Sequence, residues 1–94
     1  MTIRYKAQDV VLAYEDNSIV ARGMVMRQIG KDGDWELVET FSTGLPHTLD
    51  SEEVTKAVLL VVRGISRKDY VVNTVLEEAG ENIESQEYEF EQEP

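Results

Sequence analysis

The first part of the chain alternates apolar and polar residues with the period of a half-buried β-strand. Residues 2–15 join the alternating stretch "TIRYKA" to the β-branched and aromatic run "DVVLAYED". This pattern predicts one long strand with a bulge near Gln8 and Asp9, or two short strands. After the turn residues "EDNS", the run "SIVARGMVMRQI" predicts a second strand, in which Gly23 marks a bulge or a close backbone approach.

The segment "GKDGDW" separates the second strand from a third alternating run, "WELVETF". Asp-Gly between two apolar runs favours a tight turn with a positive φ, so residues 18–29 and 35–42 are predicted to form a hairpin. The three strands would follow one another as an antiparallel meander.

The apolar period lengthens to that of a helix after residue 50. The segment "DSEE" is typical of a helix start, with Asp50 or Ser51 as the N-cap. Leu59 and Leu60 widen the apolar stripe of this helix until it is apolar nearly all round. The stripe itself consists of Val54, Ala57, Val58, Val61, Val62 and Ile65.

A second helix is predicted after the first. Ser66 and Asp69 repeat the capping pattern, and Gly80 is a natural C-cap. The predicted fold class is therefore α+β: a three-stranded antiparallel meander followed by two α-helices packed on one face. We expect one domain over residues 1–80 and an acidic segment over residues 81–94, which forms either a short C-terminal edge strand or a tail.

The first helix needs cover on two sides because both sides are apolar. The sheet covers one side, and the second helix or a symmetry mate must cover the other, since monomers rarely leave a large apolar patch exposed. We therefore expect a homodimer whose interface contains Val58, Leu59, Leu60 and Val62.

Negative charge is concentrated at the C-terminal end. The net charge is -10, and the stretch from residue 77 onward contains eight glutamates and no base. In "ESQEYEFEQEP" the glutamates alternate with two aromatic residues, so an extended chain would carry carboxylates on one face at a spacing of ~6.8 Å. Such a row would suit a basic groove that binds nucleic acid. We expect a partner-binding surface of Glu84, Glu87, Tyr88, Glu89, Phe90, Glu91 and Glu93.

Catalytic and metal-binding patterns are missing from the sequence. His47 is the single histidine, and its polar neighbours in the chain do not amount to a triad, which needs three groups fixed in space. The segment "DGDWE" lacks the later ligands of a helix-loop-helix calcium site, and the chain has no cysteine. We expect no enzymatic activity, no cofactor and no metal.

Two functions agree with these features. The first is a small acidic, non-catalytic inhibitor or regulator that presents its carboxylates to a basic, nucleic-acid-handling protein, as phage-type anti-defence proteins do. The alternative is a structural or adaptor homodimer whose acidic end serves only solubility and edge protection. The strong negative charge argues against direct binding to nucleic acid or membranes. The N-terminus lacks an apolar signal region, so we expect a cytoplasmic protein.

Overall fold

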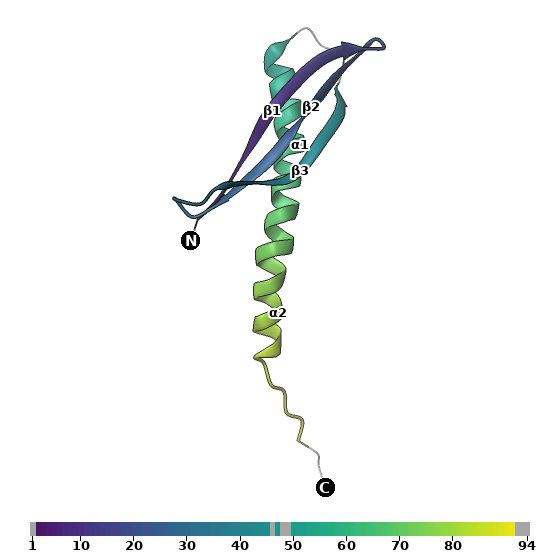
Figure 1. Ribbon diagram of the computed structural model, residues 1–94. Coiled ribbons are helices and arrows are strands. Elements are labelled where there is room, and N and C mark those ends of the chain that lie inside the picture. The colour runs from purple at the N-terminus through teal and green to yellow at the C-terminus, as the bar shows by residue number, and fades with distance from the viewer. Residues whose placement is uncertain (1, 46, 48–49, 92–94) are drawn as a thin grey trace.

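The protein consists of a three-stranded antiparallel sheet and one long helical rod that crosses one face of the sheet and runs beyond it (Figure 1). The computed structural model describes residues 2–45, 47 and 50–91. In chain order the elements are β1 (Ile3–Glu15), β2 (Ser18–Ile29), β3 (Trp35–Leu45), α1 (Ser51–Tyr70), the π-helical turn η1 (Val71–Val75) and α2 (Leu76–Glu84). The α+β class and the meander are confirmed, with strand order β1-β2-β3.

β1 is one long strand with a bulge, as one of the two predictions had it. Its register against β2 shifts between Gln8 and Val11, and Asp9 takes a positive φ of 53° within the bulge. Asp16 and Asn17, with φ of 50° and 62°, form the tight turn to β2. Two consecutive residues with positive φ match the twist of a hairpin, and Asp and Asn tolerate this conformation better than most residues.

The β2–β3 hairpin is confirmed, but its turn differs from the prediction. The positive φ of 76° belongs to Gly30, not to the glycine of the Asp-Gly pair. Gly33 is needed for another reason: a Cβ at this position would collide with the backbone carbonyl oxygen of Ile29. Gly23 is a point of close approach as predicted, because a Cβ there would lie 2.8 Å from Cζ of Phe41.

α1 begins as predicted, with the side chain of Asp50 accepting a hydrogen bond of 2.8 Å from the backbone N–H of Glu52. The predicted break into two separate helices does not occur. The Ser66 hydroxyl donates to the carbonyl oxygen of Val62 within the helix, at 2.7 Å, and Asp69 faces the sheet. Because neither residue caps a new helix, the rod continues through this region. The predicted C-cap at Gly80 is also wrong, since the helix continues past Gly80 to Glu84.

The core is small and lies between the sheet and α1. Its buried residues are Ala21, Val25, Phe41, Val58 and Val62. Among the described residues α2 contacts η1 and no strand, so α2 does not fold back to cover the first helix. The radius of gyration is 20.3 Å, compared with ~12 Å for a compact domain of this length. The molecule is therefore elongated. The C-terminal part of the rod, η1 and α2, extends beyond the sheet and is called the projecting half below.

Candidate functional site

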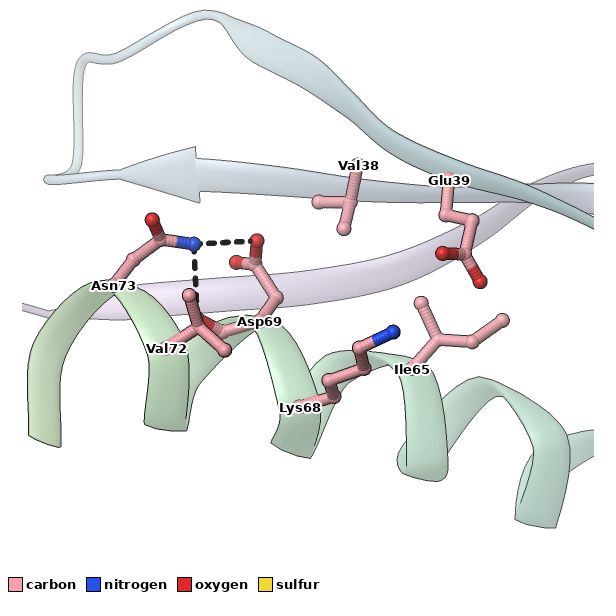
Figure 2. A pocket seen from close by; sticks show the side chains of 7 residues that line it. All are labelled: Val38, Glu39, Ile65, Lys68, Asp69, Val72 and Asn73. Atoms are coloured by element: carbon pink, nitrogen blue, oxygen red, sulfur yellow. Dashed lines mark hydrogen bonds between the residues drawn. The ribbon is translucent and has the colours of Figure 1, made fainter. Parts of the chain in front are cut away.

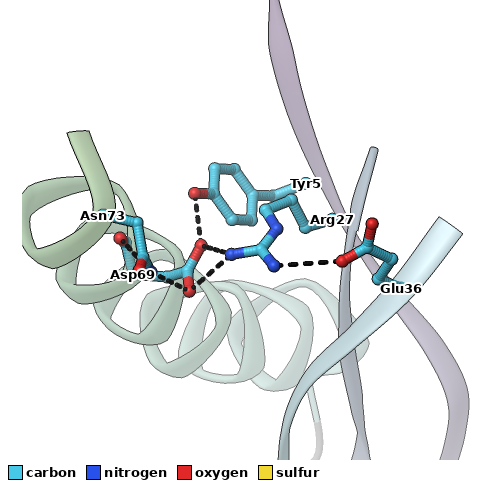
Figure 3. Close-up of polar contacts among 5 residues, drawn as sticks. All are labelled: Tyr5, Arg27, Glu36, Asp69 and Asn73. Carbon is cyan, nitrogen blue, oxygen red and sulfur yellow. Dashed lines mark hydrogen bonds and ion pairs between the residues drawn. The ribbon is translucent and has the colours of Figure 1, made fainter. Parts of the chain in front are cut away.

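A polar cluster marks the place where the rod leaves the sheet. Asp69 on α1 lies beneath β1 and β2, and its carboxylate accepts hydrogen bonds from the Tyr5 hydroxyl at 2.7 Å and from the Arg27 guanidinium at 2.9 and 3.0 Å (Figure 3). Asn73, one turn further on, donates to the same carboxylate at 2.9 Å, and Arg27 also pairs with Glu36 of β3 at 3.1 Å. The cluster therefore ties the helix to all three strands.

The electrostatics of this cluster are those of a structural clamp. Burial and the hydrogen bond to Asp69 raise the pKa of the Tyr5 hydroxyl to about 12. The hydrogen bonds to Glu36 and Asp69 raise the pKa of Arg27 above its usual value. Tyrosine stays neutral and arginine stays charged near neutral pH, so neither Tyr5 nor Arg27 is poised to transfer a proton there.

A shallow hollow of about 160 Å³ lies beside the clamp, between β3 and the rod (Figure 2). Its apolar lining comes from Val38, Ile65 and Val72, and Glu39 and Lys68 are among its polar lining residues. Three of its lining residues are apolar, and its Asp69 carboxylate already accepts hydrogen bonds from Tyr5, Arg27 and Asn73, so the hollow suits an apolar side chain.

The projecting half of the rod carries an exposed apolar stripe. In η1 the N–H of Leu76 donates to the carbonyl of Val71, five residues back. Such a turn holds one residue more than an α-helical turn, so α2 is rotated by about 100° relative to an uninterrupted helix. The apolar side chains of α2 therefore point in a different direction from Val58 and Val62, the α1 side chains that face the sheet. The large members of the stripe and their exposed fractions are Val72 (53%), Val75 (43%), Leu76 (58%) and Ile83 (71%).

The predicted dimer interface is divided by the structure. Val58 and Val62 are each 7% exposed and pack against the chain's own sheet. They are not available to a second copy, because the sheet covers the side of α1 on which they lie. Leu59 and Leu60 remain exposed on the rod, at 47% and 67%.

The predicted partner-binding residues lie at the far end of the rod. Glu84 ends α2, and residues 86–91 continue beyond it without regular secondary structure and, within the described part of the chain, without a partner strand (Figure 1). Tyr88 and Phe90 are 81% and 90% exposed, so these rings anchor nothing within their own chain. Glu93 lies outside the described residues. The glutamates at 87, 89 and 91 are exposed, and among the described residues no base pairs with them.

The face of the sheet opposite the helix carries two cationic side chains, although the net charge of the whole chain is -10. Arg4 and Lys6 of β1 lie over the ring of Trp35 in β3, with Lys6 Nζ 4.2 Å and Arg4 Cζ 5.8 Å from its centroid. The Arg4 guanidinium donates to the side-chain oxygen of Gln28. Within the described part of the chain, neither Arg4 nor Lys6 forms an ion pair with a carboxylate.

The residues considered for catalysis are not assembled into a site. His47 is exposed, and its Nε2 lies 2.7 Å from the hydroxyl of Tyr14. In the ranges 2–45 and 50–91, together with residue 47, no three histidine or acidic side chains gather in a way that could hold a metal ion. No helix of the same residues is long and apolar enough to cross a membrane.

Comparisons with known proteins do not add to this description: no protein-family model, curated protein or solved structure matches the chain.

Sequence reasoning missed the clamp and the cationic face. The alternating pattern puts Tyr5 and Arg27 on strands but predicts no partner for either, and the capping pattern assigns Asp69 a different role. The alternation of Arg4 and Lys6 along β1 was a usable signal, because alternate residues of a strand share one face. For the stripe, Ile83 follows Ala79 at helical spacing and shows that the apolar pattern continues past Gly80.

Proposed function

We propose that this chain is a non-catalytic protein-binding domain that works as a homodimer through the projecting half of its rod. The observation that carries this proposal is the apolar stripe of η1 and α2. Val72, at its start, lines the hollow beside β3, but no strand contacts α2 within the described residues, and Leu76 and Ile83 are 58% and 71% exposed. Isolated helices of this length are marginal in water and obtain most of their stability from packing. A second copy supplies that packing, since the stripe of one rod can bury the stripe of the other.

The distribution of acids on α2 supports the same function. Glu77, Glu78, Glu81 and Glu84 are all exposed on the projecting half, and at about 100° per residue they fall on a different side of α2 from Leu76 and Ile83. An amphipathic helix with a separate acidic face can bury its apolar side in an interface and keep its carboxylates in water. The dimer therefore retains a negatively charged surface for other proteins.

Sedimentation equilibrium tests the homodimer. The wild-type chain is expected to be dimeric at micromolar concentration, and Leu76→Glu is expected to make it monomeric because the new carboxylate would be buried in the interface. Asn82→Glu is the matched control, since it adds the same charge to α2 at a polar position and should leave the dimer intact. A monomeric wild-type chain at high micromolar concentration would contradict the proposal.

A second candidate function is favoured by the acidic segment. In this function the chain is an inhibitor or regulator whose glutamates from residue 84 onward occupy a basic groove on a nucleic-acid-handling protein, as in phage-type anti-defence proteins. The eight glutamates after residue 76, with no base among them, support it. Contacts dominated by charge weaken steeply with salt.

Affinity capture from a lysate at low and high salt tests this second function. The full chain is compared with a chain in which Glu87, Glu89 and Glu91 are changed to Gln, which keeps the helix and both aromatic rings. The function is supported if the wild type captures a basic protein at low salt, and if this capture is lost both at high salt and when the three glutamates are changed to Gln. Equal capture by both chains at both salt concentrations contradicts it.

A further inference from the structure

We propose that the acidic segment of one copy, residues 86–91, adds as a strand to the free edge of β1 of a second copy, beside Arg4 and Lys6. This inference rests on the proposed homodimer and names what the acidic segment does within it. The edge offered is the first half of β1, from Ile3 to Gln8, before the bulge at Asp9 interrupts the strand.

The two edges of the sheet differ in charge. β1 and β3 are both edge strands, because the strand order is β1-β2-β3. β3 carries Glu36 and Glu39 on the face toward the helix, whereas the first half of β1 carries Arg4 and Lys6 on the opposite face and no acid before Asp9. A segment rich in carboxylates is therefore favoured at the β1 edge over the β3 edge.

The acidic segment has the pattern of a strand that fits this edge. Residues 86–91 have no regular secondary structure in the single chain, and Tyr88 and Phe90 alternate with Glu87, Glu89 and Glu91. When paired with β1, the three carboxylates lie on the face that holds Arg4 and Lys6, and the two rings lie on the face toward the helix, next to Tyr5. The main chain of the segment then forms hydrogen bonds with the unpaired N–H and C=O groups at the edge of β1. An edge strand without such a partner can pair non-specifically with other chains and aggregate.

The segment cannot pair in this way with its own sheet. β1 meets the rod at the Tyr5–Asp69 hydrogen bond, and the rod carries Glu84 ~16 Å beyond Asn73, at 1.5 Å per residue. Gln86 follows Glu84 by two residues and can return by at most ~7 Å. The start of the segment therefore stays well short of its own β1, and a second copy must provide the edge.

An antiparallel pairing of the projecting halves delivers the segment to that edge. With Val75 of one rod opposite Ile83 of the other, Ser85 of each copy lies level with Asn73 of its neighbour, one turn from Asp69, and the segment then runs in the same direction as β1, past Arg4 and Lys6. A parallel pairing would place the two acidic segments side by side, where their like charges repel. Antiparallel pairing instead brings each segment to bases that have no carboxylate partner of their own.

Charge exchange between the two strands tests the proposal by sedimentation equilibrium of the full chain. Lys6→Glu and Glu89→Lys are each expected to weaken the dimer about tenfold, because each places like charges opposite each other at both symmetric edges. The two changes in one chain should restore the affinity to within about threefold. Lys56→Glu, which changes the net charge equally at an exposed position of α1 away from this edge, should alter the affinity less than twofold. Circular dichroism confirms that each variant folds.

Amide hydrogen exchange of the wild-type chain gives a second readout that needs no variant. Amides of residues 86–91 should become protected as the concentration rises through the dimer dissociation constant. The inference is overturned if these amides exchange freely in the dimer, if both single changes leave the dimer unaffected, or if the combined change fails to restore it. Those outcomes leave the homodimer standing, whereas a wild-type chain that is monomeric removes both proposals.

Discussion

Replacing Tyr5 by Phe removes one hydroxyl from the clamp and leaves the ring in place. That hydroxyl donates to Asp69 Oδ2 at 2.7 Å, and the Asp69 side chain is 10% exposed, so the lost bond has a charged and largely buried acceptor. Hydrogen bonds to charged groups contribute about 1.5–3 kcal/mol. Asp69 keeps Arg27 and Asn73 as partners. We therefore expect Tyr5→Phe to lower the free energy of unfolding by about 1.5 kcal/mol at pH 8.

The difference between the wild type and Tyr5→Phe should shrink as the pH rises. The folded pKa of Tyr5 is raised from 10.0 to about 12. The corresponding stabilisation is fully present below pH 10 and is lost as the pH rises through the folded pKa. At pH 11 the unfolded chain gains about 1.4 kcal/mol by releasing this proton. Because part of the ring lies at the surface, we expect a loss of about 1 kcal/mol.

Urea unfolding followed by circular dichroism at pH 8, 9, 10 and 11 measures this difference at one fixed protein concentration. Comparing the two chains cancels the contributions of lysines and of the other tyrosines, which are the same in both. A difference that stays constant from pH 8 to 11 would refute the coupling of Tyr5 to Asp69. So would a Phe variant that is as stable as the wild type at pH 8.

Three further changes, two of them with a matched control substitution, test the fold by urea unfolding at the same fixed protein concentration. Gly33→Ala should cost more than about 2 kcal/mol, since the new Cβ collides with a backbone carbonyl, whereas Gly44→Ala has open space around it and should cost less than about 1 kcal/mol. Val62→Ala should cost about 2 kcal/mol through the cavity it leaves in the core, and Leu60→Ala, at an exposed position of the same helix, should cost under about 0.5 kcal/mol in the monomeric Leu76→Glu background. Arg27→Met should cost about 3 kcal/mol because Asp69 loses its paired charge, and equal stability with the wild type would show that the clamp does not stabilise the fold.

Local patterns in the sequence were enough to predict the meander and the start of the helix. The alternation along β1 and β2, the turn residues Asp16 and Asn17, and the cap at Asp50 each act over a few neighbouring residues. Interactions of this range depend on backbone sterics and on side-chain to backbone hydrogen bonds, and these are similar in most folds. The concentration of acids after residue 76 is likewise a property of the sequence alone.

Tertiary contacts decided where the helix ends and what its two halves face. Ser66 and Asp69 fit a capping pattern, but their side chains bond to Val62 and to the strands, so the helix has no reason to stop there. A second helix could cover α1 only if the chain turned back, and the continuous rod removes that turn. The clamp also depends on the fold, because it joins Tyr5 and Arg27 to a residue far along the chain. Such long-range pairing is set by the register of the sheet and by the packing of the helix on it, which short-range patterns do not encode.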